Sequence, residues 1–313
     1  MPSSLEAALQ ALQSPDALRP ESLSGLSDMD AAATALARNL WPTLPLERRQ
    51  EAMRLCGELA LEHIELNFDR LAVIGLSDSD PSVRARAIAN LWESEDLALL
   101  PRLIGLLRED PDAVVRCEAA SALGRFVLLL EETEADDQRR RALEDGLLAA
   151  AADPDVELRL HALESLGYSS RDEIPALIQE AYAADERSRR SALLAMGRSG
   201  DRRWRAQVEA DLRHPSPVIR REAARAAGEL ELRPAVAELV DLLDDVDPEV
   251  QLQAVWALGQ IGGKVAERAL LHLLESAGDD PLSAAVDEAL QHLAFLEGTR
   301  DIDATLRRQR SAE

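Results

Sequence analysis

One short sequence phrase returns along this chain at a nearly constant interval. It consists of an acidic residue, often a proline, an aliphatic residue, an arginine, an alanine three residues later, and an apolar residue followed by glycine. The arginine position anchors each copy, and the eight anchors are residues 49, 84, 116, 159, 189, 220, 251 and 283, with Gln and Ser at the last two. The anchors lie 30 to 35 residues apart except for one interval of 43, so the chain is predicted to be a repeat protein.

Each repeat is predicted to be a pair of helices. Between the phrases lie amphipathic segments such as residues 99–107 and 235–243, whose apolar residues recur at helical spacing. Within the phrase, Asp can cap a helix, Pro suits its first turn, and Gly is expected to end the helix in a left-handed conformation. The aliphatic residue, the Ala and the apolar residue are four residues apart, so they form one stripe for packing against neighbouring helices.

These features predict an all-α fold, a right-handed α-α superhelix of about eight helical-hairpin repeats. Aromatic residues make up only 3% of the chain, which agrees with helices that pack closely through small aliphatic side chains. Residues 1–40, with predicted helices at 5–13 and 28–40, are expected to form an N-terminal helical cap. Residues 41–298 are expected to form the solenoid, and residues 299–313 a flexible tail because they lack apolar periodicity.

The one long interval between anchors predicts an insertion near residues 126–145. We call the helix that contains the phrase in each repeat the phrase helix. The sequence of the insertion suggests a lengthened phrase helix followed by a loop that is first acidic and then basic, extending through residue 141. Insertions in solenoids often carry recognition, but a solvated loop explains the same residues. Both interpretations remain open from the sequence.

The charge balance excludes some classes of partner. Lys and Arg number 35 and Asp and Glu 58, which gives a net charge of −23 that repels nucleic-acid phosphates and anionic lipid headgroups. We therefore expect no nucleic-acid or membrane partner. Cys56 and Cys117 have no CxxC spacing and are predicted to be small buried hydrophobic residues, which fits the reducing cytoplasm, and the N-terminal residues show no leader pattern.

The sequence shows none of the common catalytic motifs. The five histidines lie in different repeats without metal-ligand spacing, so no metal site and no cofactor is predicted. The segment 259–264 ends in Gly-Lys but lacks the first glycine and the Ser/Thr of a phosphate-binding loop, so it is interpreted as a turn between helices. We expect a protein that is not an enzyme.

The period and the Asp-Pro-x-Val-Arg…Ala…Leu-Gly phrase, seen at residues 80–84 and 110–124, resemble HEAT repeats of the short bacterial type, including phycobilisome-lyase-like proteins. The resemblance covers roughly residues 41–295. It implies that the recurring arginines bond to loop aspartates of neighbouring repeats as a structural ladder, with a ligand-binding role as the alternative. These arginines are Arg84, Arg116, Arg159, Arg189 and Arg220.

A solenoid presents an extended concave face lined by one helix of each repeat, and this face is the expected binding surface for a protein or peptide of unknown identity. Positions two and five residues after each anchor supply the candidate binding residues Arg86, Glu118, His161, Glu164, Glu222, Arg225 and Trp256. Trp256 is interpreted either as an interface anchor or as a packing residue between repeats. The predicted function is a non-catalytic scaffold or adaptor; the alternative, implied by the resemblance alone, is a lyase or chaperone for a tetrapyrrole-type chromophore. The sequence does not specify the partner, the pathway or the oligomeric state.

Overall fold

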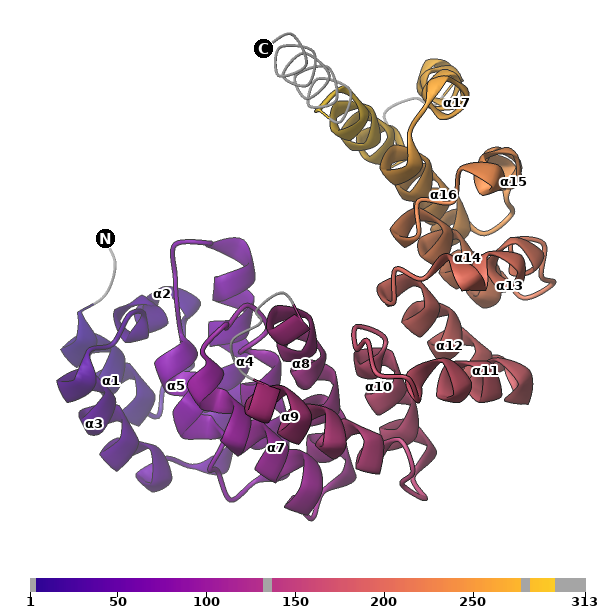
Figure 1. The fold of residues 1–313 in the computed structure, drawn as a ribbon. Coiled ribbons are helices and arrows are strands. Elements are labelled where there is room, and N and C mark those ends of the chain that lie inside the picture. Colours follow the sequence, from indigo (N-terminus) through magenta and orange to yellow (C-terminus); the bar gives the residue numbers. More distant parts are fainter. Residues whose placement is uncertain (1–3, 132–136, 277–281, 296–313) are drawn as a thin grey trace, which may run out of the picture. The chain divides into compact units, whose positions relative to one another are not determined.

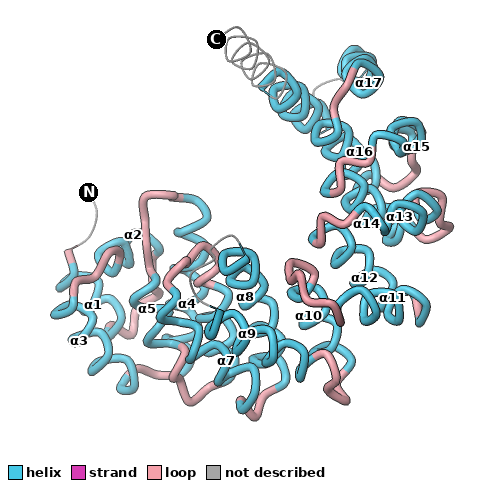
Figure 2. Tube along the Cα trace, in the orientation of Figure 1, coloured by secondary structure: helices cyan, strands magenta, loops and turns pink. Residues whose placement is uncertain are grey.

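A computed structural model describes residues 4–131, 137–276 and 282–295. All regular structure in these ranges is helical and no strand occurs among them (Figures 1 and 2). The predicted all-α class of stacked helical hairpins is confirmed. The predicted tail at 299–313 lies outside the described residues. None of the described helices combines the length and the apolar character needed to cross a membrane.

The chain divides into two compact units, which the repeat period does not predict. The N-terminal unit comprises residues 1–166 and the C-terminal unit residues 167–313. The helices of the N-terminal unit are α1 (Leu5–Gln13), α2 (Pro20–Leu23), α3 (Ala31–Leu40), α4 (Leu46–Glu62), α5 (Asp69–Gly75), α6 (Pro81–Ala89), α7 (Leu100–Glu109), α8 (Ala113–Glu131), α9 (Asp137–Ala150) and α10 (Val156–Leu166), with 3-10 turns η1 (Ser24–Leu26), η2 (Trp41–Thr43) and η3 (Leu97–Leu99).

The N-terminal unit contains two layers of helices. The phrase helices α4, α6, α8 and α10 contact one another in sequence order, and α5, α7 and α9 pack against them as the second layer. Helices α2 and α3 contact α4 and α5, which places the predicted cap residues against the first hairpin.

The C-terminal unit repeats the same arrangement. Phrase helices α12, α14 and α16 form one layer, and α11, α13, α15 and α17 pack along it as the other (Figure 1). Its helices are α11 (Ile174–Ala184), α12 (Glu186–Arg198), α13 (Arg205–Asp211), α14 (Pro217–Glu229), α15 (Val236–Asp241), α16 (Pro248–Ile261) and α17 (Lys264–Ser276), with 3-10 turns η4 (Arg202–Trp204), η5 (Arg233–Ala235) and η6 (Leu242–Asp244), and residues 282–295 are also helical.

The core lies between the two layers and is made by the apolar stripe of each phrase. In α8, the side chains of Val115, Ala119 and Leu123 are completely buried, and the equivalent residues of α10, α14 and α16 are buried in the same way. Cys56 and Cys117 are free and buried, as predicted, and burial raises the pKa of the Cys56 thiol. Small residues in the middle of the stripe let neighbouring helices approach closely.

Two aspartates, and not one, stand before most phrase helices. In the turn before α6, Asp80 caps the helix by accepting hydrogen bonds from the backbone of Ser82 and Val83, while the Asp78 side chain accepts from the Asp80 N–H at 2.9 Å. Before α8, the predicted cap Asp110 instead has the role of Asp78, and Asp112 caps the helix. The phrase alone did not separate these two roles.

No phrase glycine among the described residues has the predicted left-handed conformation, so that prediction was wrong, although Gly167 does directly follow the last residue of α10. Gly197, Gly228 and Gly259 lie inside α12, α14 and α16, and among the described residues the phrase glycines show no positive φ. They serve close packing: a Cβ built on Gly228 would lie 2.6 Å from the Trp256 ring and 3.0 Å from the Ala257 Cα. Only a residue without a side chain allows the next helix this near.

The left-handed residue lies three positions later. Gly200, Glu231 and Gly262 have φ values of 62°, 47° and 72°, and they occupy the same position in three consecutive repeats. This conformation turns the chain from the phrase helix into the helix that follows. Two repeats use glycine there, and one uses a glutamate in spite of the steric cost.

The insertion is largely helical. Helix α8 is lengthened to 19 residues, as predicted, and ends at Glu131. The loop predicted through residue 141 is wrong from Asp137 onward, because the basic residues that follow it form the first turns of α9. Residues 132–136 lie outside the described ranges.

Candidate binding surface

The anchor arginines bind the turn that precedes their own helix. In Arg84, Arg116, Arg159 and Arg220, Nη1 donates to the two carbonyl oxygens six and five residues earlier, at 2.8–3.3 Å. At position 251 the glutamine keeps the first of these bonds, to Asp245 O at 2.8 Å. These bonds fix each turn to the start of its phrase helix.

Two anchors also reach the next repeat with a bidentate ion pair. Arg84 donates to both carboxylate oxygens of Asp110 at 2.7 and 2.8 Å, and Arg220 donates to both of Asp245 at 2.7 and 2.8 Å. The carboxylates are almost completely buried. Parallel hydrogen bonds between a guanidinium and a carboxylate are the strongest form of this contact.

The other anchors differ from this arrangement. Arg189 stacks on the Tyr182 ring at 4.6 Å and lies 3.6 Å from Asp211, a looser ion pair. Within the described residues, Arg116 forms no ion pair, because the insertion separates its repeat from the next turn of the same kind. Arg49, at the first anchor, pairs with the buried Asp78, which also accepts from the Trp41 indole at 2.7 Å.

The ion pair in the C-terminal unit predicts a pH dependence of stability. The hydrogen bonds from Arg220 hold the pKa of Asp245 below its usual range. A lowered pKa in the folded state stabilises the fold above the unfolded value of about 4, and this contribution is lost as the pH falls through the folded pKa. We expect the free energy of unfolding, measured with urea at pH 5 and pH 3, to fall less with acid in Asp245→Asn than in the wild type. Equal losses in both proteins would contradict the assignment.

Four candidate residues lie on phrase helices of the N-terminal unit. Arg86 on α6 is exposed, whereas Glu118 on α8 and both His161 and Glu164 on α10 are half-buried. The imidazole of His161 is 2.9 Å from the Ser121 hydroxyl, which joins α8 to α10. These residues therefore form part of the phrase-helix layer of this unit.

The other candidates lie in the C-terminal unit, and one of them differs from expectation. Glu222 is only 8% exposed, so its predicted exposure was wrong. It is held inside the layer, with one oxygen 3.2 Å from Arg221 and the other buried without a hydrogen-bond partner. Arg225, on the same helix, is half-buried and donates to Glu229 at 3.0 Å. Burial lowers the pKa of Arg225, but the carboxylates of Glu229 and Glu222 outweigh it and raise this pKa on balance.

Trp256 is both packed and accessible. One edge of its ring lies against Gly228 of the preceding phrase helix, and 38% of its surface remains exposed. The two interpretations from the sequence are therefore compatible, since the glycine contact fixes the ring and leaves its other side to solvent.

Three further residues extend this surface, and sequence reasoning missed them. Tyr168, Arg198 and Glu229 each follow a phrase glycine, nine positions after an anchor. The Arg198 guanidinium lies over the Tyr168 ring at 5.0 Å, and the Glu229 carboxylate lies against Gly197. Positions two, five and nine after an anchor share one face of a helix, so this helical spacing was the available signal. We call Tyr168, Arg198, Arg225, Glu229 and Trp256 the Trp256 face.

The chemistry of this surface suits noncovalent binding. It combines two aromatic rings with two arginines and a carboxylate, on the turn that follows α10 and on helices α12, α14 and α16 of the C-terminal unit. In the part of the chain that the structure describes, no group of three His, Cys, Asp or Glu residues is placed to hold a metal ion.

Comparison with known proteins identifies the repeat. A family model of HEAT repeats matches residues 70–144 and 206–294, more than half of the chain. No curated protein matches the chain at a significant level.

Solved structures share the fold. The CpcE–CpcF complex of phycocyanin lyase from Nostoc aligns with a TM-score of 0.50 and 22% identity, covering 72% of this chain and 94% of that chain. Yeast importin-β (Kap95p) aligns with a TM-score of 0.52 and 13% identity, covering 92% of this chain but 46% of importin-β, so the chain spans less than half of that protein. Likeness at this level of identity shows the fold alone.

Proposed function

Because this chain belongs to the HEAT-repeat family, we propose that it is a non-catalytic scaffold that binds a protein or peptide through the Trp256 face. The observation that carries the proposal is the half-packed, half-exposed ring of Trp256 beside the Arg225–Glu229 pair. HEAT solenoids present continuous helical surfaces that suit extended partners.

The side chains of the Trp256 face are preorganised for binding. An indole already held against Gly228 loses little freedom when a partner covers it, and tryptophan and arginine are the residues that most often dominate interface energies. Arg225 is likewise held by Glu229, so a partner meets a fixed charge next to a fixed aromatic surface. A partner that offers an apolar side chain flanked by polar groups would satisfy both.

The alternative function is the lyase or chaperone for a tetrapyrrole-type chromophore. It rests on the resemblance to phycobilisome-lyase-like proteins, and the Nostoc lyase complex supports it through the fold alone. The residues of the Trp256 face do not favour this ligand over a peptide, so the scaffold is the leading proposal.

The test is to capture partners from the native cell on immobilised full-length protein and then measure their affinity with purified components. Trp256→Ala is expected to weaken binding of the true partner about thirtyfold, the effect of losing a strong interface residue. Arg225→Ala should weaken it by a smaller factor.

The matched control is Arg213→Ala. Arg213 is paired with Glu238 at 2.9 Å, much as Arg225 is paired with Glu229, but it lies in the turn between α13 and α14, away from the Trp256 face. If every captured protein binds Trp256→Ala as tightly as the wild type, the proposed surface is wrong. A coloured small molecule that copurifies, without any protein partner, would favour the chromophore alternative.

A further inference from the structure

A second surface of the C-terminal unit lies at the turns that lead out of its phrase helices. Three consecutive repeats carry a basic residue two positions after the left-handed residue of the turn. Arg202 begins η4, Arg233 begins η5 and Lys264 begins α17. These residues are 31 positions apart, one repeat, and Lys264 is the only lysine of the chain. We call these three residues the basic row. The equivalent residue of the preceding repeat is Asp172, so the row begins at Arg202.

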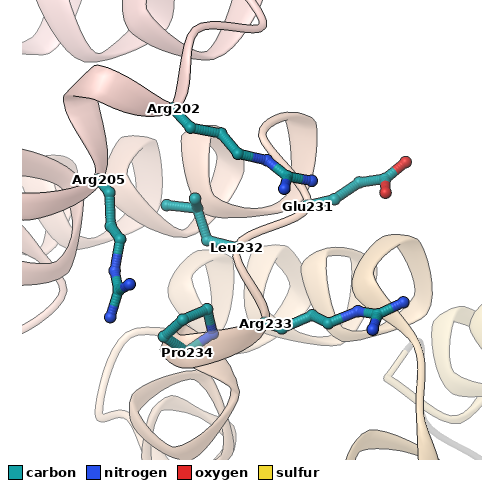
Figure 3. A pocket seen from close by; sticks show the side chains of 6 residues that line it. All are labelled: Arg202, Arg205, Glu231, Leu232, Arg233 and Pro234. Atoms are coloured by element: carbon teal, nitrogen blue, oxygen red, sulfur yellow. The ribbon is translucent and has the colours of Figure 1, made fainter.

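Hollows separate the members of the row. Between the first two lies one of about 400 Å³, lined by Arg202, Arg205, Glu231, Leu232, Arg233 and Pro234 (Figure 3). In Figure 3 the side chains of Arg202 and Arg233 extend in the same direction on either side of Glu231, and Arg205 points away from them. The next hollow, of about 310 Å³, lies between Arg233 and Lys264 and includes the apolar side chains of Val236 and Val265.

The side chains of the row are unpaired in the part of the chain that the structure describes. Arg202, Arg233 and Lys264 are exposed, and within the described residues their side chains form no ion pair or hydrogen bond. Arg205, in contrast, is paired with Glu209 at 2.7 Å. Free cations in register are unusual in a chain of net charge −23, where carboxylates are abundant.

Glu231 is the one acidic residue that lines these two hollows, and its backbone is strained. It has a φ of 47° where the repeats on either side have Gly200 and Gly262. A non-glycine residue in this conformation is sterically unfavourable, and such outliers cluster at functional sites. Its carboxylate partly offsets the positive potential between Arg202 and Arg233.

We propose that the basic row binds an extended acidic peptide. Neighbouring helices stack about 10 Å apart, and one turn of an extended polyproline II chain, three residues long, spans about the same distance and brings every third side chain to the same face. A peptide with a carboxylate at every third position would therefore place one on each member of the row. The residues between them would rest on Leu232, Pro234 and Val265 in the hollows.

A peptide fits this surface better than a nucleic acid. The row offers three separate charges, whereas a polyphosphate chain extends beyond them into the field of a protein with net charge −23. A short acidic peptide carries fewer negative charges into that field, so it is repelled less than a nucleic acid while it still contacts the local cations. The row shares no residue with the Trp256 face, so this proposal does not depend on the proposed function.

The test is fluorescence anisotropy of a labelled synthetic peptide with glutamate at every third position, titrated with the full-length protein at low salt. The triple variant Arg202→Gln, Arg233→Gln and Lys264→Gln is expected to bind it about tenfold more weakly, the summed effect of three exposed charge contacts. The analogue with glutamine in place of glutamate should bind the wild type no better than it binds the triple variant.

The control variant changes the net charge equally and leaves the row intact. It carries Arg54→Gln, Arg86→Gln and Arg213→Gln, all exposed residues outside the row, and it should bind the peptide as the wild type does. Glu231→Gly should bind it about two- to threefold more tightly because it removes the opposing charge, a gain that partial unfolding cannot produce.

Three results would overturn the proposal. They are equal affinity of the wild type and the triple variant, an equal loss in the control variant, and tighter binding of a single-stranded oligonucleotide that depends on the same three residues. The last would assign the row to nucleic acid.

Discussion

Replacing Arg84 with methionine is expected to lower the free energy of unfolding by about 3–5 kcal/mol, the usual cost of removing one partner from a buried ion pair. Methionine fills much of the same space but leaves Asp110 buried and without its two charged hydrogen bonds. Arg84 also ties the carbonyl oxygens of Asp78 and Ser79 to the start of α6, and these bonds are lost as well. Urea unfolding followed by circular dichroism measures the change.

The double variant Arg84→Met, Asp110→Leu tests whether the loss in Arg84→Met comes from leaving the Asp110 carboxylate buried without its partner. Because neither side chain is then a lone buried charge, it should recover part of the stability that Arg84→Met loses. The control Arg54→Met removes an exposed ion pair with Glu58 and should change stability by less than about 1 kcal/mol. If Arg84→Met is no worse than Arg54→Met, the ladder does not stabilise this unit.

The second large effect is expected at a phrase glycine. A Cβ on Gly167 would lie 2.8 Å from the Cα and 2.9 Å from the carbonyl oxygen of Ala195, both backbone atoms that no side-chain rotation can move away. Gly167→Ala should therefore push α12 outward and lower the free energy of unfolding by about 2–3 kcal/mol. Thermal and urea unfolding of the full chain provide the measurement.

Gly105→Ala is the matched control, for which the expected change in the free energy of unfolding has the opposite sign. Gly105 lies inside α7, and a Cβ there meets no atom within 4 Å. Alanine in a helix without steric conflict should stabilise the protein by about 0.5–1 kcal/mol. A loss of stability in Gly105→Ala, or none in Gly167→Ala, would contradict the close-packing role of the phrase glycine.

The sequence predicted the helical hairpins and the buried stripe well because both depend on local spacing. Val115, Ala119 and Leu123 recur four residues apart, and this spacing alone places them on one side of a helix. Helix α1 occupies the predicted residues 5–13 for the same reason. The repeat also made the prediction robust, since each copy supports the others.

Local spacing predicted the candidate binding surface less well. It selected Arg225 and Trp256 but treated Glu222 as exposed, although this residue has the same position in its repeat as Glu118. It stopped at the fifth position after the anchor and so missed Tyr168, Arg198 and Glu229. The exposure of such positions depends on what the adjacent repeat places against them, which the pattern of one repeat does not contain.

The sequence by itself determined the class of fold, the length of the repeat and the residues of the core, because these follow from helical periodicity and the burial of apolar side chains. Only the tertiary structure decided which aspartate caps and which pairs with arginine, that the phrase glycine serves close packing, and that Glu231 has the left-handed conformation. It also brought Arg202, Arg233 and Lys264 into one row. The ion pairs, the glycine contacts and the row depend on distances between residues about one repeat apart, and those distances are set by how closely neighbouring helices stack.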